Sequence, residues 1–243
     1  MCEMCRRNSI ERFEPSRRGV LGAAISTMGL LLASAAGAKE MKAPPKPQNV
    51  LTPAASLERL RKGNARYVEG VSLRHDFKHE REALAGGQNP YAAVLSCADS
   101  RIAPEYAFDS GRGDLFVCRV AGNFANSESV ASLEYAVAEL GTPLILVLGH
   151  DACGAVSATI KSLKDNTTLP GHLPSLVEGI APAVKAVSGQ TGDTLANAIR
   201  QNVIDNVGKL SSATPILSAA VEQNKLKVVG GIYRLRDGRV EMV

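Results

Sequence analysis

Short apolar runs that alternate with longer helical patterns constrain the fold of this chain more than any other feature. Four such runs, rich in Val, Leu and Ile, are typical of strands that are buried on both faces of a parallel sheet. They span residues 91–96, 115–120, 144–148 and 226–232, and helical patterns cover residues 128–140, 154–163, 176–186 and 193–210. The alternation predicts an α/β fold in which helices flank a mostly parallel central sheet.

Each end of this pattern carries one more element. From residue 54 the periodicity is helical, with Leu57, Leu60 and Tyr67 near one face, which predicts an N-terminal helical arm. Near the other end, Asp237-Gly238 is a hairpin turn signal. Residues 240–243 are therefore expected to pair antiparallel to the last apolar run, as the edge strand of the sheet.

The composition fits one globular domain with extra sequence, since 45% of the 243 residues are hydrophobic and 21% are charged. The net charge is +4, and it falls to +2 without residues 1–38, which hold five Arg and three Glu. This excess is too small for a nucleic-acid-binding surface. Trp is absent and aromatic residues make up only 4% of the chain, which also argues against base stacking. We expect no nucleic-acid partner.

The first residues resemble a twin-arginine export signal. Arg17-Arg18 ends a basic segment, an uncharged stretch covers residues 19–38, and Ala36-Gly37-Ala38 offers small residues for cleavage. We therefore expect residues 1–38 to be a signal peptide that the export machinery reads, and the mature protein to be periplasmic or secreted. A retained membrane anchor is the alternative, but Gly, Ser and Ala make the stretch a weak span. No stable membrane anchor is expected after cleavage.

A Pro-rich segment separates this leader from the domain. Residues 39–53 are polar and contain Pro44, Pro45 and Pro47, which is typical of a linker. The domain itself is expected over residues 54–243.

Candidate metal ligands follow two of the predicted strands. Cys97 comes directly after the first apolar run, and His150 and Cys153 follow the third. Because crevices in an open parallel sheet lie outside the carboxyl ends of its strands, these two loops can converge although 53 residues separate Cys97 from His150. A helix is expected to start after Cys153, and its N-terminus favours the thiolate form of that residue.

Two sulfurs and one imidazole suit zinc best, and they leave a fourth position for water or for Asp99. Each part is weak by itself. A Cys at a strand end is more often a small buried apolar residue, and an Asp-Ser-Arg tripeptide is usually a turn. The placement of all the parts just after apolar strands favours a metal site.

Two segments together resemble the paired signature of β-class carbonic anhydrases: Cys97-Ala98-Asp99-Ser100-Arg101 and Gly149-His150-Asp151-Ala152-Cys153-Gly154. Supporting resemblances lie at residues 87–90, 113–116, 119–123 and 133–137, and the similarity covers about residues 54–243. The resemblance implies a zinc enzyme that reversibly hydrates CO2 to bicarbonate and a proton. Its Zn²⁺ would be held by Cys97, His150 and Cys153, with Asp99 as a fourth ligand in a closed form of the site.

The resemblance also assigns other roles. Asp99 would accept a hydrogen bond from the attacking nucleophile, and Arg101 would hold Asp99 away from the metal. The cleft would be lined by both subunits of a homodimer, or of a higher oligomer built from dimers. Candidate bicarbonate-binding and cleft-lining groups are Gln88, the Gly154 backbone N–H, Phe116 and Tyr135. For the two aromatic residues, an ordinary place in the core is the alternative.

Two other functions are compatible with the same residues. A zinc site of this kind could hydrolyse a CO2 analogue, carbon disulfide or carbonyl sulfide. The chain could also be a non-catalytic zinc or bicarbonate-binding protein, although a structural zinc site needs only four closed ligands and no Asp99–Arg101 pair. Two thiolates make zinc a weaker Lewis acid than three imidazoles do, so an enzyme of this kind is expected to favour mildly alkaline conditions.

Overall fold

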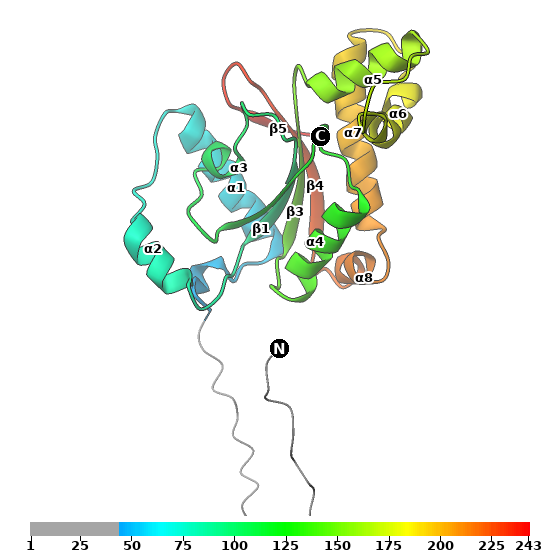
Figure 1. The fold of residues 1–243 in the computed structure, drawn as a ribbon. Coiled ribbons are helices and arrows are strands. Elements are labelled where there is room, and N and C mark those ends of the chain that lie inside the picture. The colour runs from blue at the N-terminus through cyan, green and yellow to red at the C-terminus, as the bar shows by residue number, and fades with distance from the viewer. Residues whose placement is uncertain (1–43) are drawn as a thin grey trace, which may run out of the picture. The chain divides into compact units, whose positions relative to one another are not determined.

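The computed structural model describes residues 44–243, which are built around a five-stranded sheet (Figure 1). The strands are β1 (Ala92–Ser96), β2 (Leu115–Arg119), β3 (Leu144–His150), β4 (Lys227–Tyr233) and β5 (Val240–Met242). They lie in the order β2-β1-β3-β4-β5. The first four are parallel, and β5 pairs antiparallel with β4. The predicted fold class is therefore confirmed.

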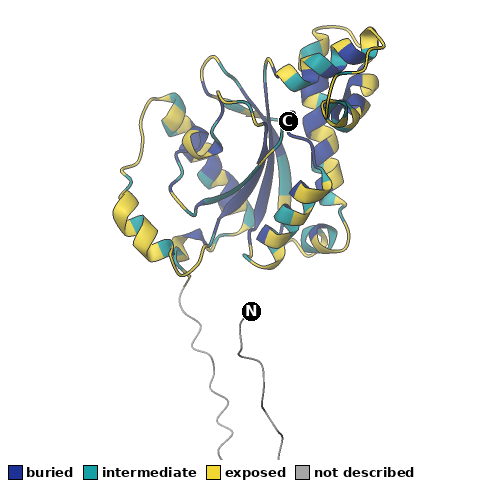
Figure 2. Cartoon of the chain, viewed as in Figure 1, coloured by how far each residue is buried: buried dark blue, intermediate teal, exposed yellow. Residues whose placement is uncertain are grey.

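Helices cover both faces of the sheet (Figure 1). On one face, α1 (Pro53–Val68) and α3 (Pro104–Ala107) bury apolar side chains against β1 and β3. On the other face lie α4 (Ser127–Ala138), α7 (Thr194–Ser211) and α8 (Ile216–Glu222). Two more helices, α5 (Gly154–Lys164) and α6 (Pro174–Ala186), pack together and against α7. Figure 2 shows the result, a buried sheet between helices with exposed outer sides.

The N-terminal helical arm forms where the pattern predicts it. Thr52 accepts a hydrogen bond from the Ala55 N–H at 3.2 Å, and Pro53 occupies the first turn of α1, where a missing N–H costs nothing. Leu57 and Leu60 are buried, and they fix α1 against the sheet.

The strand order makes the carboxyl end of β1 a topological switch point. The chain leaves β1 for β2 on one side and then returns to β3 on the other side, so the connections diverge at the carboxyl end of β1. Such switch points are where open parallel sheets bind ligands. Because β1 and β3 are hydrogen-bonded neighbours, with Ser96 opposite Leu148, the loops that follow them do converge as predicted.

Three details differ from the predictions. β2 is only half-buried, because as an edge strand it has a single neighbour. β3 extends two residues further, to His150, since Gly149 and His150 remain paired with β4. The short helices α2 (Phe77–Leu84), α3 and α8 were not predicted, because segments of at most eight residues give little periodic signal.

The second half of the expected linker belongs to the domain. The chain forms a short 3₁₀ helix, η1 (Pro47–Asn49), and Asn49 is buried. The Asn49 amide donates to the Asn89 carbonyl at 2.8 Å and to Asp114 at 3.0 Å, while Lys46 forms a salt bridge with Asp114. Composition alone does not reveal these contacts.

The predicted signal peptide and the first five linker residues lie outside residues 44–243. Within the described part of the chain, no helix combines the length and hydropathy needed to cross a bilayer.

Candidate metal centre

Three buried side chains converge at the carboxyl end of the sheet. Cys97 directly follows β1, His150 is the last residue of β3, and Cys153 caps the start of α5. One sulfur or nitrogen atom from each lies within 4.8 Å of the others, and no other group of this kind occurs among residues 44–243. Between His150 and Cys153, Ala152 adopts a left-handed conformation with φ of 50°, which turns the chain so that both ligands face one point.

The donor set fits a zinc ion. The His150 Nδ1 donates to the Asp151 carbonyl at 2.8 Å, so the other ring nitrogen carries the lone pair. That nitrogen, Nε2, is buried and has no hydrogen-bond partner within the described chain. A buried nitrogen in this state is costly unless something occupies its lone pair, and a metal ion does so. Of the divalent ions found in proteins, zinc is the one that two thiols and one imidazole suit best.

Backbone N–H groups favour the thiolate form of both cysteines. The nearby Cys153 and the Gly122 N–H, which lies 3.2 Å from the Cys97 sulfur, lower the pKa of Cys97, although burial opposes this. The closeness of the two sulfurs, together with burial, raises the pKa of Cys153, and the amides at the start of α5 offset part of the effect. These amides act on Cys153 in the direction that the expected helix N-terminus predicts.

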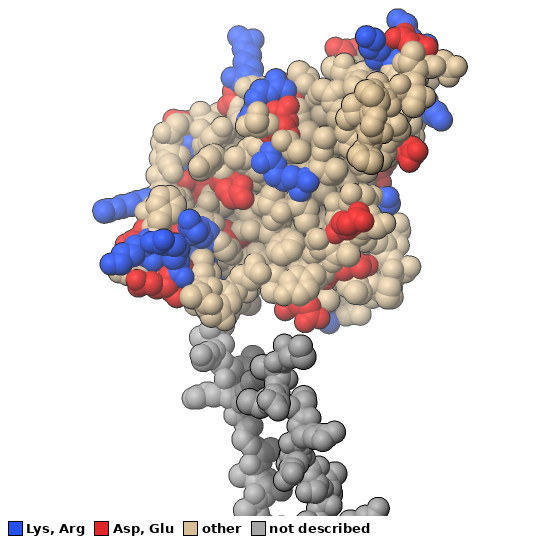
Figure 3. All heavy atoms as spheres, viewed as in Figure 1, with Lys and Arg blue, Asp and Glu red and all other residues tan. Residues whose placement is uncertain are grey.

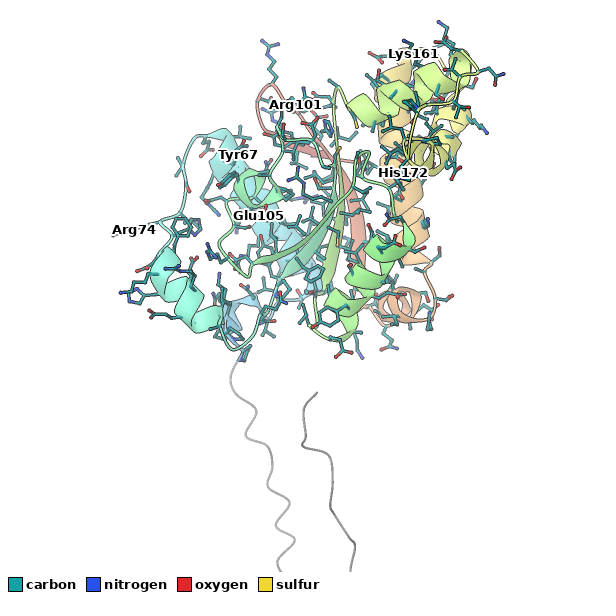
Figure 4. All side chains as sticks on the ribbon, viewed as in Figure 1. Tyr67, Arg74, Arg101, Glu105, Lys161 and His172 are labelled. Atoms are coloured by element: carbon teal, nitrogen blue, oxygen red, sulfur yellow. The ribbon has the colours of Figure 1, made fainter. Side chains whose placement is uncertain are left out.

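Asp99 and Arg101 form a two-pronged ion pair beside this group. The Arg101 Nε and Nη2 donate to the two Asp99 carboxylate oxygens at 2.9 and 2.7 Å, and the Arg101 backbone N–H adds a third bond at 2.9 Å. Arg101 holds the pKa of Asp99 well below its usual range. Asp99 Oδ2 lies 3.9 Å from His150 Nε2. The carboxylate therefore faces the metal group, by which we mean Cys97, His150 and Cys153, without belonging to it. Figure 4 shows Arg101 at this end of the sheet.

Two residues of the segment 119–123, to which the sequence assigned no individual role, shape the loop after β1. The Arg119 side chain donates to the carbonyls of Cys97 and Asp99 at 2.9 and 2.7 Å, and so connects the end of β2 to the loop after β1. Gly122 supplies the N–H to the Cys97 sulfur, and its φ of 87° favours glycine. The resemblance of residues 119–123 pointed to this segment without assigning either contact.

Comparisons with known proteins agree with this geometry. The family model described as "Carbonic anhydrase" matches residues 92–240. Carbonic anhydrase 2 of Mycobacterium tuberculosis is 40% identical over 189 residues, which cover 77% of this chain and 91% of the relative. The chain belongs to the carbonic anhydrase family. The carbonic anhydrase of Mycolicibacterium smegmatis is similar at 38% identity, over 78% of this chain and 93% of that protein.

Solved structures assign the β class of the family. The β-carbonic anhydrase CcaA is 29% identical with a TM-score of 0.59, over 76% of this chain and 94% of that one. A second match is one of two tetrameric β-carbonic anhydrases from Sordaria macrospora, 25% identical with a TM-score of 0.60 over 78% and 94% of the two chains. The resemblance seen in the two motifs is therefore confirmed for the fold and the family.

The other residues that the resemblance named, Gly154, Phe116, Tyr135 and Gln88, lie at different distances from the metal ligands. Gly154 is the first residue of α5, directly beside Cys153. Phe116 on β2 and Tyr135 on α4 have their ring centroids 6.4 Å apart, and Tyr135 is 50% exposed, so it is not a core aromatic residue. Gln88 is exposed and precedes β1, whereas Cys97 follows it. The length of this strand, about 16 Å at 3.3 Å per residue, keeps Gln88 away from the metal ligands of its own chain.

Proposed function

We propose that the chain is a zinc-dependent β-carbonic anhydrase that catalyses the reversible hydration of CO2 to bicarbonate and a proton. The observation that carries this proposal is the convergence of Cys97, His150 and Cys153 beside an intact Asp99–Arg101 pair. A purely structural zinc site needs no Asp–Arg ion pair beside its ligands. The curated relatives that cover most of the chain carry the name carbonic anhydrase.

The residues of the chain divide the work as follows. When bound, zinc supplies a Lewis acid that lowers the pKa of water and makes a hydroxide nucleophile available near neutral pH. Asp99 accepts a hydrogen bond from the nucleophile and so orients it, because the carboxylate is ionised and faces His150. Arg101 keeps both Asp99 oxygens in place. The Gly122 N–H withdraws charge from the Cys97 thiolate, which partly offsets the weakening of the Lewis acid by two sulfurs.

Metal analysis and stopped-flow hydration of CO2 across pH test this proposal. We expect about one zinc per chain and a rate that rises toward mildly alkaline pH. Carbon disulfide and carbonyl sulfide are supplied as competing substrates in the same assay. Faster turnover of either gas than of CO2 would move the assignment to an analogue hydrolase, and full zinc content without turnover of any of the three would indicate a binding protein.

We propose further that the enzyme is a homodimer, or an oligomer of dimers, whose cleft receives Gln88 from the partner subunit. Three features of one chain support this. Gln88 precedes β1 and so lies at the end of this strand opposite Cys97. β2 is a half-buried edge strand, and Tyr135 is half-exposed next to Phe116. The face in Figure 3 has wide uncharged areas between scattered charges of both signs, which favours close contact with another copy. The matched protein from Sordaria macrospora is described as tetrameric.

Mixing two inactive variants tests the shared site. In Gln88→Ala every site lacks the amide, and in Cys97→Ala every site lacks a metal ligand. A mixed dimer contains one complete site if Gln88 acts across the interface, so random reassembly restores about a quarter of the parent rate. If Gln88 acts within its own chain, no mixed dimer contains a complete site. Absence of any recovery after verified subunit exchange would therefore contradict the proposal.

For the N-terminal region we propose a twin-arginine signal over residues 1–38, with export to the periplasm or beyond it as a folded protein. Arg17-Arg18 and the weakly apolar stretch after them support this reading. Replacing both residues by Lys is expected to stop export and cleavage near Ala38. The leader offers its own control, since the pair Arg6-Arg7 lies further from the apolar stretch and its replacement by Lys is expected to leave export intact. Equal export of both variants would contradict the assignment.

A further inference from the structure

The orientation of His150 depends on one peptide carbonyl. The His150 Nδ1–H donates to the carbonyl of Asp151 at 2.8 Å, and this bond directs the Nε2 lone pair into the metal group. A peptide that turned by a few tens of degrees would leave Nδ1 unbonded and rotate the ring. The carbonyl is therefore useful only if the Asp151 peptide is itself held.

The Asp151 peptide precedes Ala152, whose strained backbone conformation cannot by itself hold this peptide in place. Ala152 has φ of 50°, a left-handed conformation that is unfavourable for any residue with a Cβ. An isolated loop of this sequence would relax toward a right-handed conformation and carry the Asp151 carbonyl with it. Strain of this kind persists only when the surroundings impose it.

The Asp151 side chain supplies that restraint. Asp151 Oδ1 accepts a hydrogen bond from the Leu235 N–H at 2.9 Å, and the Asp151 N–H donates to the Tyr233 carbonyl at 3.2 Å. Tyr233 ends β4 and Leu235 lies two residues further on, so both partners belong to the segment 233–235. Asp151 thus bonds this segment through its backbone and its side chain, while its carbonyl faces His150.

The segment 233–235 is itself held firmly. Tyr233 is the last residue of β4, is 4% exposed, and has its hydroxyl 3.0 Å from that of Tyr67 on α1. The turn is closed by the Arg234 N–H donating to the Arg239 carbonyl at 2.8 Å and by a bond of equal length from the Gly238 N–H to the Arg234 carbonyl. The support is therefore connected to the sheet and to α1.

We infer that Asp151 is a positioning residue for the metal ligand His150: its carboxylate, held by the Leu235 N–H, fixes the carbonyl that sets the imidazole. What matters is an acceptor oxygen at this place, not the negative charge. The inference rests on the proposed zinc enzyme and adds to it a requirement on a residue that binds neither metal nor substrate.

Two opposite substitutions separate the acceptor from the charge. Asp151→Asn keeps an acceptor oxygen at the same distance from the backbone and removes the charge, while Asp151→Glu keeps the charge and moves the oxygens one bond further out. We expect the zinc-loaded Asn variant to lose metal to a chelator within about twofold of the parent rate, and the Glu variant to lose it roughly tenfold faster. Asp151→Ala is expected to behave like the Glu variant.

The absorption spectrum of the cobalt-substituted protein gives a second measurement, since it reports ligand geometry without turnover. It is expected to shift in the Glu and Ala variants and to stay at the parent position in the Asn variant. Asp237→Ala is the matched control, because Asp237 accepts the Arg239 N–H at 3.0 Å in the same turn and is not among the Asp151 contacts. Its zinc loss and cobalt spectrum are expected to match the parent.

Each contrary outcome has a distinct meaning. Fast zinc loss in the Asn variant would show that the charge matters, and parent-like behaviour of the Glu variant would show that the oxygen position does not; either result overturns the inference. A control that loses zinc as fast as the Glu variant would reduce the effect to general loosening of the turn. A parent protein that binds no zinc would overturn the proposed function itself, whereas the other outcomes leave that function intact.

Discussion

Gly122→Ala is expected to weaken the fold and the metal centre together. Gly122 has φ of 87°, and a Cβ at this position would lie 2.4 Å from Ile180 Cδ1 in the buried core. The same residue donates its N–H to the Cys97 sulfur at 3.2 Å, and Asn202 on α7 holds its carbonyl at 2.8 Å. A methyl group here therefore forces either the loop or Ile180 to move.

The cost follows from two contributions. A left-handed conformation costs a residue with a Cβ about 1–2 kcal/mol. Overlap with a packed side chain costs about 1–3 kcal/mol, toward the lower end here because the atom that is met terminates a flexible chain. The sum is about 3 kcal/mol, which for a domain of this size lowers the melting temperature by roughly 6–12 °C.

Thermal and urea unfolding of the zinc-loaded protein measure this loss, and chelator competition measures the metal. Gly122→Ala combined with Ile180→Val, which removes the overlapping Cδ1, is expected to be more stable than the sum of the two single changes predicts. Gly208→Ala is the control, because Gly208 lies within α7 with no neighbour within 4 Å of the added Cβ, and it is expected to stabilise slightly. A Gly122→Ala protein as stable as the parent would refute the argument.

Three further outcomes are expected. Replacing any one of the three metal ligands by Ala reduces zinc far below one per chain by atomic absorption, and full occupancy in all three variants would contradict the site. Arg101→Ala retains zinc but lowers CO2 hydration at least tenfold, because Asp99, freed from two bonds, turns toward the metal; Arg234→Ala, which breaks an ion pair at the same end of the sheet, leaves the rate unchanged. Asp109→Asn destabilises the fold by about 2–3 kcal/mol at pH 7, because it removes a buried partner of Arg66. Burial alone would raise the pKa of Asp109, but Arg66 and the Leu73 N–H lower it on balance, so its contribution is complete above pH of about 4–5 and disappears as the pH falls below the usual Asp range. In urea titrations, a parent-to-variant difference that stays constant down to pH of about 2 would argue against this assignment.

The fold class could be predicted because burial leaves a direct mark on local sequence. A strand such as β3, which is buried along its whole length, shows a continuous apolar run from Leu144 to Leu148, and a helix such as α7 repeats its apolar positions with the helical period. The edge position of β2 could not be predicted in the same way. Leu115 to Arg119 reads like the other strands, and only the order of strands shows that it has one neighbour.

The sequence by itself determined the chemistry of this protein: two thiols, an imidazole, and a carboxylate two residues before an arginine are fixed by residue type and spacing. Only the tertiary structure decided how these groups act. It placed β1 next to β3 so that Cys97 meets His150, it brought the Gly122 N–H to the Cys97 sulfur, and it put Gln88 at the opposite end of its own strand. The reason is that ligand identity is a local property of the chain, whereas distances across a sheet, hydrogen bonds to a ligand and strand order arise from contacts between residues far apart in sequence.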